Sequence, residues 1–241
     1  MTPQDRSTQD RFILVTGGAR SGKSTFAERL AAQLTEPLGG RVTYLATSQT
    51  NDVEMAARVA AHRAARPATW TTVECPIAVP AAVREQAGVG AQAGAAASGG
   101  PPGPPVFLLD CVTFWVTNLL FAGGAFGGSA PPEEGFNYDK DLLPAAEERA
   151  ASARVSVAVA DLLAALDETG ATLVAVTNEV GLGVVPEYPL ARLYRDQLGW
   201  ANQRLAATAG RLYFLVAGFP LDVTALAASP LTQTTVKESD Q

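Results

Sequence analysis

A glycine-rich loop near the start of the chain constrains its fold more than any other part of the sequence. The loop, Gly17-Gly18-Ala19-Arg20-Ser21-Gly22-Lys23-Ser24, follows a short apolar run at 12–15. After the loop, Phe26, Leu30 and Leu34 recur at four-residue spacing, which is the pattern of one helix face. The sequence therefore predicts a strand, a tight loop and a helix in that order.

The spacing of the glycines, the lysine and the final serine is that of a phosphate-binding loop, or P-loop. Glycines let consecutive backbone N–H groups curl around phosphate oxygens, and the lysine reaches the β and γ phosphates of a nucleoside triphosphate. The serine hydroxyl is an expected ligand of Mg²⁺. The alternative is a glycine-rich structural turn. We predict that Lys23 is catalytic and that nucleotide contacts Gly17, Gly18, Ala19, Arg20, Ser21, Gly22, Lys23 and Ser24.

The rest of the chain alternates predicted strands with predicted helices. Strands are expected at 42–46, 70–74, 106–109, 172–177 and 212–216, and helices at 52–65, 112–121, 139–166 and 190–209. Such alternation indicates a parallel sheet with helices on both faces. We therefore predict an α/β fold, namely a P-loop NTPase-like (RecA-like) three-layer sandwich with a mostly parallel sheet.

Two stretches interrupt this alternation. Residues 87–105 are rich in Ala, Gly and Pro, and residues 122–137 are rich in Gly and Pro. We expect both to be surface insertions without chemistry. The predicted organisation is a disordered tail at 1–10, a single P-loop domain at 11–220 that contains both insertions, and a C-terminal tail at 221–241.

The composition of the chain excludes some classes of binding partner and some locations in the cell. The net charge of -6 and the pI of about 4.9 disfavour nucleic acid, which needs a basic surface. Cys75 and Cys111 show no metal-ligand spacing, so we expect buried free thiols. No apolar run has the length of a membrane span, and the N-terminus lacks a signal-peptide core. We expect a cytoplasmic protein.

Two carboxylates follow predicted strands. A P-loop usually works with a carboxylate at the end of a neighbouring strand that holds Mg²⁺, and Asp110 fits this role. The alternative is that Asp110 caps the following helix. Glu179 also ends a strand at the same predicted sheet edge, where ligands of open α/β sheets bind. Glu179 is therefore expected either to face the substrate or to act only as a cap.

His62 is the only histidine of the chain, and Arg58 and Arg66 lie four residues to either side. The three residues would share one helix face. Nearby guanidinium groups favour a neutral imidazole and bind phosphates, which suits a histidine that attacks phosphorus to form a phosphoramidate. Spacing alone, however, favours a solvated helix face.

These segments together resemble the bifunctional adenosylcobinamide kinase/adenosylcobinamide-phosphate guanylyltransferases. The resemblance spans about 12–216, apart from the two insertions. Besides the P-loop, it rests on Ala46-Thr47-Ser48-Gln49, Glu54-Met55-Ala56-Ala57-Arg58, His62 with Arg66-Pro67, and the segments 70–74, 116–120, 177–181, 185–187 and 191–206.

The resemblance implies an enzyme that phosphorylates adenosylcobinamide with ATP or GTP and then transfers GMP from GTP to that phosphate. The GMP is carried on a histidine, which corresponds to His62. A homo-oligomer such as a trimer is also implied. Some relatives carry a second histidine where Ala61 stands, or Glu in place of Asp110. The implied nucleotide contacts beyond the P-loop are Ala46, Thr47, Ser48, Arg63, Ala64, Ala65, Arg66, Glu74 and Asp110, with Ser24 and Asp110 on the metal.

Two other functions are compatible with a P-loop. One is a kinase of another small molecule without nucleotidyl transfer, in which His62 is incidental. The other is a regulatory nucleotide switch, for which a guanine-reading Asn-Lys-x-Asp element would be expected. Asn178-Glu179-Val180-Gly181 is not that element.

Overall fold

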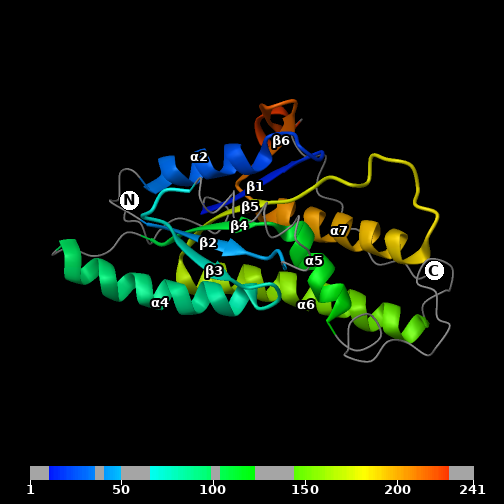
Figure 1. The fold of residues 1–241 in the computed structure, drawn as a ribbon, viewed down its shortest axis with the longest axis horizontal. Coiled ribbons are helices and arrows are strands. Elements are labelled where there is room, and N and C mark those ends of the chain that lie inside the picture. Colours follow the sequence, from blue (N-terminus) through cyan, green and yellow to red (C-terminus); the bar gives the residue numbers. More distant parts are fainter. Residues whose placement is uncertain (1–10, 36–40, 50–65, 99–103, 123–143, 228–241) are drawn as a thin grey trace.

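A seven-stranded sheet runs through the centre of the structure, which is a computed structural model (Figure 1). The structure describes residues 11–35, 41–49, 66–98, 104–122 and 144–227. The strand order is β3-β2-β4-β5-β1-β6-β7, and only β7 is antiparallel to its neighbour. The strands are β1 (Phe12–Gly17), β2 (Val42–Ala46), β3 (Thr71–Glu74), β4 (Val106–Asp110), β5 (Thr172–Val176), β6 (Arg211–Val216) and β7 (Phe219–Asp222).

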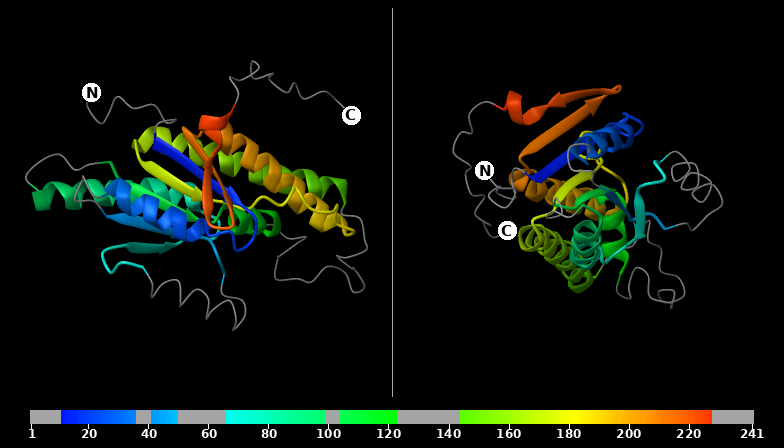
Figure 2. Two further views of the ribbon diagram at one scale, coloured as in Figure 1. Left: turned by 90° about the horizontal axis from the view of Figure 1, so that it is seen from above. Right: turned by 90° about the vertical axis from the view of Figure 1, so that its left-hand side faces the viewer.

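Helices cover both faces of the sheet. Figure 1 shows α2 above the sheet and α4 and α6 below it. In Figure 2 the hairpin of β6 and β7, drawn in orange, extends at one edge of the sheet. None of the described helices has both the length and the apolar character needed to cross a bilayer. The helices are α2 (Lys23–Thr35), α4 (Val79–Ser98), α5 (Val112–Phe121), α6 (Ala145–Thr169), α7 (Pro189–Thr208) and α8 (Val223–Leu226).

The alternation of side chains along the strands builds two hydrophobic cores. On β1, Phe12 and Leu14 join the core that contains α4, α5, α6 and α7, whereas Ile13 and Val15 join the core under α2. Successive residues of a strand point to opposite faces, so a strand buried on both faces is apolar throughout. The predicted α/β three-layer sandwich with a mostly parallel sheet is confirmed.

Two boundaries expected from the sequence differ in the structure. The expected insertion at 87–105 begins inside α4, which continues to Ser98. Alanine has the highest helix propensity, and the alanines of this stretch outweigh its glycines. The predicted tail also starts too early, because β7 and α8 occupy 219–226. A four-residue strand that contains Pro220 gives little sequence signal. The predicted helix at 52–65 and most of the segment at 122–137 lie outside the described residues.

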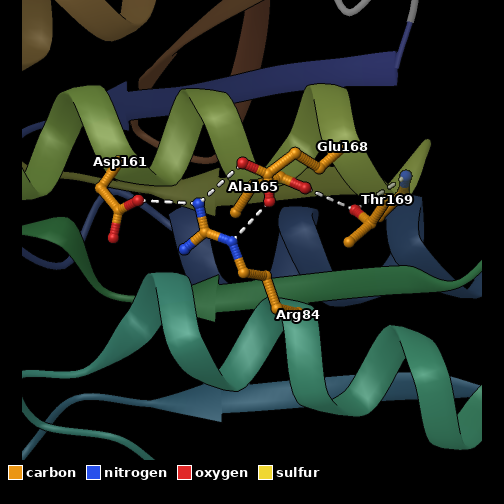
Figure 3. A network of polar contacts seen from close by, with 6 residues as sticks. Arg84, Asp161, Ala165, Glu168 and Thr169 are labelled. Atoms are coloured by element: carbon orange, nitrogen blue, oxygen red, sulfur yellow. Dashed lines mark hydrogen bonds and ion pairs between the residues drawn. The ribbon is translucent and has the colours of Figure 1, made fainter.

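An arginine joins α4 to α6 (Figure 3). Arg84 donates from Nε to Glu168 at 2.6 Å and from Nη2 to Asp161 at 2.7 Å. The guanidinium lowers the pKa of both carboxyl groups below their ordinary values. Lowered carboxyl pKa values stabilise the fold at neutral pH, and that contribution is lost as the pH falls through the folded-state values. All three side chains are exposed to solvent, so the network mainly fixes the register of the two helices.

Two valines on α6 test how the core stabilises the fold. Val159 is 1% exposed and Val157 is 67% exposed. We expect Val159→Ala to lower the free energy of unfolding by about 2 kcal/mol, because it leaves a cavity in the core. The matched change Val157→Ala should cost less than about 0.5 kcal/mol. Urea denaturation measures both, and equal costs would contradict the packing described here.

Candidate active site

The P-loop joins the end of β1 to the start of α2, as the sequence predicts. The first hydrogen bond of the helix runs from the Phe26 N–H to the Gly22 carbonyl at 3.0 Å. The N–H groups of Lys23, Ser24 and Thr25 therefore have no carbonyl one turn earlier to bind. Unpaired N–H groups and the helix dipole both attract anions at this end of a helix. The loop thus presents a phosphate-binding geometry.

Close packing against β6 fixes the shape of the loop. Gly17 has a φ of 149°, and a Cβ atom at this position would lie 2.5 Å from the Leu215 carbonyl oxygen. Arg20 and Gly22 also have positive φ, at 55° and 90°. The N–H of Gly218, in the turn between β6 and β7, donates to the Ser21 carbonyl at 3.0 Å. The β6–β7 hairpin, which the sequence did not reveal in full, therefore holds the loop from one side.

Lys23 holds its ammonium group over the loop. Its side chain is buried, and Nζ donates to the Gly18 carbonyl at 2.5 Å and lies 3.5 Å from the Ser21 hydroxyl. Burial lowers the pKa of Lys23, and the nearby Asp110 carboxylate opposes this shift. Asp110 and Val15 both lie opposite Val176 of β5, so the carboxylate at the end of β4 lies at the same sheet edge as the loop that holds Lys23.

Asp110 is bound by a tyrosine that sequence analysis missed. Tyr44 donates from its hydroxyl to Asp110 Oδ2 at 2.7 Å. Burial, with a further contribution from Asp110, raises the pKa of Tyr44 far above its ordinary value, so the tyrosine stays a donor. In the register of β2 and β4, Tyr44 lies opposite Leu108, and Asp110 is its diagonal neighbour. Only the strand pairing brings the two side chains together.

Arg66 covers the other side of this tyrosine. Its guanidinium carbon lies 3.2 Å from the centre of the Tyr44 ring, which is a cation–π arrangement. Nη1 also lies 3.4 Å from the Thr72 hydroxyl. Arg66 thus connects the start of the segment 66–74 to the residues around Asp110.

Three strand ends meet where the sequence predicts nucleotide contacts. Ala46 at the end of β2 lies opposite both Glu74 of β3 and Asp110 of β4. Ser48 is partly exposed, but the Thr47 side chain is fully buried and pairs with the backbone of Cys111 at 2.7 and 2.8 Å. The Thr47 hydroxyl therefore braces the strand ends. The predicted residues His62, Arg63, Ala64 and Ala65 lie outside the described residues.

Both cysteines are buried free thiols, as predicted. Burial raises the pKa of Cys75 to about 11. It raises the pKa of Cys111 to about 12, and Asp110 contributes to that shift. The thiols stay protonated near neutral pH, so neither is a thiolate nucleophile in this structure.

The loop after β5 is tied to the P-loop. The Glu179 N–H donates to the Gly17 carbonyl at 3.2 Å, and its carboxylate accepts from the Gly181 N–H at 2.6 Å. Asn202 of α7 accepts from the Thr177 hydroxyl at 2.7 Å and donates to the Asn178 carbonyl at 3.0 Å. Glu179 also lines a cavity next to β1. Sequence analysis left its role open and did not identify Asn202 as the support of this loop.

Two glycines of the P-loop give a matched test of its geometry. We expect Gly17→Ala to lower the free energy of unfolding by more than about 1 kcal/mol, because the new Cβ meets the Leu215 carbonyl. At Gly18 a Cβ would have no atom within 4 Å, so Gly18→Ala should change stability by less than about 0.5 kcal/mol. Urea denaturation compares them, and an unaltered Gly17→Ala protein would rule out the close packing.

Three named proteins are similar to this chain over most of its length. The bifunctional adenosylcobalamin biosynthesis protein CobU of Salmonella typhimurium is 42% identical over 212 residues, which cover 88% of this chain and 99% of the relative. The protein of the same name from Escherichia coli is 40% identical over the same shares. The bifunctional adenosylcobalamin biosynthesis protein CobP of Pseudomonas aeruginosa is 38% identical over 208 residues, which cover 86% of this chain and 94% of the relative.

One solved structure that is similar is the ATPase domain of G40P, and the match covers 88% of this chain and 70% of that structure's chain. The TM-score is 0.47 and the sequence identity is 11%, so this similarity is too distant to bear on function. A family model described as "Cobinamide kinase / cobinamide phosphate guanyltransferase" matches residues 13–223. That match covers most of the chain, and the relatives are matched over nearly their whole length. The chain therefore belongs to the cobinamide kinase / cobinamide phosphate guanyltransferase family.

Proposed function

We propose that this protein phosphorylates the aminopropanol hydroxyl of adenosylcobinamide with ATP or GTP, and then transfers GMP from GTP to the new phosphate. The observation that carries the proposal is the meeting of the P-loop, Lys23 and Asp110 at one sheet edge, in a chain of this family. Neither rival function explains both activities in the family description. We propose further that the protein acts in the cytoplasm as a homo-oligomer.

In the kinase step the P-loop would bind the triphosphate. The N–H groups at the start of α2 would bind phosphate oxygens, and Lys23 would add positive charge beside the β and γ phosphates. An ammonium group has three donors, and its contacts with Gly18 and Ser21 place it directly over the loop. The substrate hydroxyl oxygen would then bond to the γ-phosphorus while the bond to the β–γ bridging oxygen breaks, which releases the nucleoside diphosphate, and the hydroxyl proton would pass to solvent.

The residues present fit Mg²⁺. A serine hydroxyl and an aspartate carboxylate are hard oxygen ligands, and Mg²⁺ in nucleotide sites takes one or two carboxylates together with phosphate oxygens. Ser24, at the start of α2, and Asp110, whose charge reaches Lys23, would hold it. When bound, the ion would neutralise charge on the triphosphate. Tyr44 would orient the Asp110 carboxylate through their hydrogen bond.

In the guanylyl transfer His62 would carry the GMP. Its neutral imidazole would bond to the α-phosphorus of GTP as the bond to the β-phosphate breaks, which releases pyrophosphate. A phosphate oxygen of adenosylcobinamide phosphate would then bond to the same phosphorus while the nitrogen–phosphorus bond breaks. The product is adenosylcobinamide-GDP, and His62 returns to its free form.

The anchoring of Arg66 supports a role for His62 at this site. Arg66 stacks on Tyr44, which in turn binds Asp110. His62 precedes Arg66 by four residues, and four residues of extended chain span at most about 14 Å. The covalent chain therefore limits how far His62 can lie from Arg66, which is compatible with its proposed role.

A single substitution should block one of the two reactions and leave the other. With His62→Asn we expect the kinase step to continue, because the P-loop is intact, and GMP transfer to fall below detection, because the nucleophile is gone. Incubation with adenosylcobinamide, Mg²⁺ and GTP, followed by chromatography, measures both products. Adenosylcobinamide phosphate should accumulate. Formation of adenosylcobinamide-GDP by the variant would contradict the role of His62.

Loss of the loop lysine should impair both reactions. We expect Lys23→Ala to lower kcat/KM of each step by about 100-fold or more, because the ammonium group stabilises negative charge on the transferring phosphate. Arg29→Ala serves as the control, since Arg29 is an exposed cation on the same helix. Steady-state kinetics compare the variants, and equal losses at both positions would contradict a specific role for Lys23.

A further inference from the structure

A cavity of about 480 Å³ lies beside the P-loop, on the face of the sheet that α7 covers. Such a volume lies within the usual range of small-molecule sites. Its walls come from β1, β6, α7 and the loop after β5. The residues used in the argument below are Thr16, Glu179, Asp196, Trp200, Gln203 and Leu212.

The inner end of this cavity adjoins the phosphate-binding loop. Thr16 directly precedes Gly17 in the chain. Glu179, which lines the same end, donates its N–H to the Gly17 carbonyl at 3.2 Å. A molecule in the cavity would therefore have one end next to the loop that holds the triphosphate. A kinase acceptor needs that position, because its hydroxyl must come within bonding reach of the γ-phosphorus.

The lining suits a neutral ligand that is rich in hydrogen-bond donors. Glu179 uses one carboxylate oxygen to accept from Gly181, which leaves acceptor capacity for a ligand. Asp196 of α7 adds a second carboxylate, whose Oδ1 accepts from the neighbouring Arg195 at 3.0 Å and whose Oδ2 leaves acceptor capacity, and Gln203 adds an amide. Arg195, which also lines the cavity, balances the charge of Asp196, so the remaining charge of the lining is that of Glu179, which disfavours a phosphate beside it because like charges repel. Primary amides and hydroxyls, in contrast, can donate to both carboxylates.

An exposed tryptophan forms the outer part of the site. Trp200 is 63% exposed on α7 and lines the cavity, and Leu212 of β6 adds apolar surface. Aromatic surface in contact with water is unfavourable, and a flat ligand that packs on it removes that surface from water. The cavity thus combines a polar inner end with an aromatic outer end.

We propose that this cavity binds the corrinoid acceptor, a proposal that rests on the proposed function. Cobinamide is a flat ring with primary amides at its edge and an aminopropanol arm that ends in the reacting hydroxyl. The arm enters toward Thr16 and Glu179, amide groups donate to Glu179 and Asp196, and the ring packs on Trp200. The cavity holds the arm and one edge of the ring, while the remainder of the corrinoid stays outside.

Kinetics of substitutions at the two ends of the cavity test the proposal. Glu179→Gln keeps an oxygen for the Gly181 N–H but replaces the other acceptor with a donor. Trp200→Ala removes the aromatic surface, and Trp200→Phe restores part of it. Glu85→Gln, an exposed carboxylate on α4 that does not line the cavity, is the matched control for Glu179→Gln. Thermal unfolding checks that all variants are folded.

We expect Glu179→Gln and Trp200→Ala each to raise the KM for cobinamide about tenfold, the size of change expected when one good contact is lost. The KM for GTP should stay within about twofold, Glu85→Gln should stay close to the wild type, and the KM of Trp200→Phe for cobinamide should lie between those of the wild type and Trp200→Ala. Equilibrium dialysis of cobinamide, with a non-hydrolysable GTP analogue present, should show the same weakening without turnover.

Two results would overturn the proposal. If the wild type phosphorylates cobinamide and both folded cavity variants keep its KM, the acceptor binds elsewhere, and the proposed function stands. If the KM for GTP rises as much as that for cobinamide, the cavity belongs to the nucleotide site. A wild type that does not phosphorylate cobinamide would instead reject the proposed function, together with the identity of this ligand.

Discussion

The parallel pairing of β1 with β5 and β6 is the constraint on which the site depends. It brings the end of β1 so close to β6 that Gly17 has no room for a Cβ atom beside Leu215. The chain must therefore turn sharply into the P-loop, and α2 starts with unpaired N–H groups at that point. Because the strands are parallel, Asp110 and the loop that contains Glu179 end at the same edge. The residues proposed to bind phosphate and those proposed to bind the acceptor thus lie at one sheet edge.

Lys23 is buried and Asp110 is partly buried at this edge, and each charged group has different partners. The ammonium group of Lys23 is buried against the oxygens of its own loop, with Asp110 close enough to oppose the loss of its proton. The Asp110 carboxylate is held by a hydroxyl that stays protonated, and Arg66 packs on that tyrosine ring. Buried charges need such partners, since an unpaired one would be costly. The same partners fix both groups for work on a triphosphate.

The sequence predicted the regular parts of this structure well. The apolar runs of the sequence predicted β1, β2, β4 and β5 to within one or two residues, and β2 has the predicted bounds. These strands were predictable because a strand buried on both faces is apolar throughout. The P-loop was recognisable because its chemistry requires fixed spacing. The extension of α4 into 87–98 and the short strand β7 were missed. In α4 alanine propensity outweighed glycine, and in β7 four residues are too few for a periodic pattern.

The sequence did not predict several side-chain contacts of the site. Tyr44 meets Asp110 only through the diagonal register of β2 and β4, and Asn202 meets the Glu179 loop only because α7 packs beside it. No local pattern specifies either contact. The expected contact of Thr47 with the nucleotide stays a prediction, but the hydrogen bonds of its hydroxyl with the Cys111 backbone were not predicted. Roles that depend on His62 remain predictions, because that residue lies outside the described part of the chain.

The most direct test of the central claim is the mass of the intact protein after incubation with Mg²⁺ and GTP and without cobinamide. The proposed mechanism predicts an acid-labile adduct of the mass of GMP on the wild type, and none on His62→Asn. An adduct on both proteins, or on neither when both are folded and bind GTP, would contradict a guanylyl-histidine at this position.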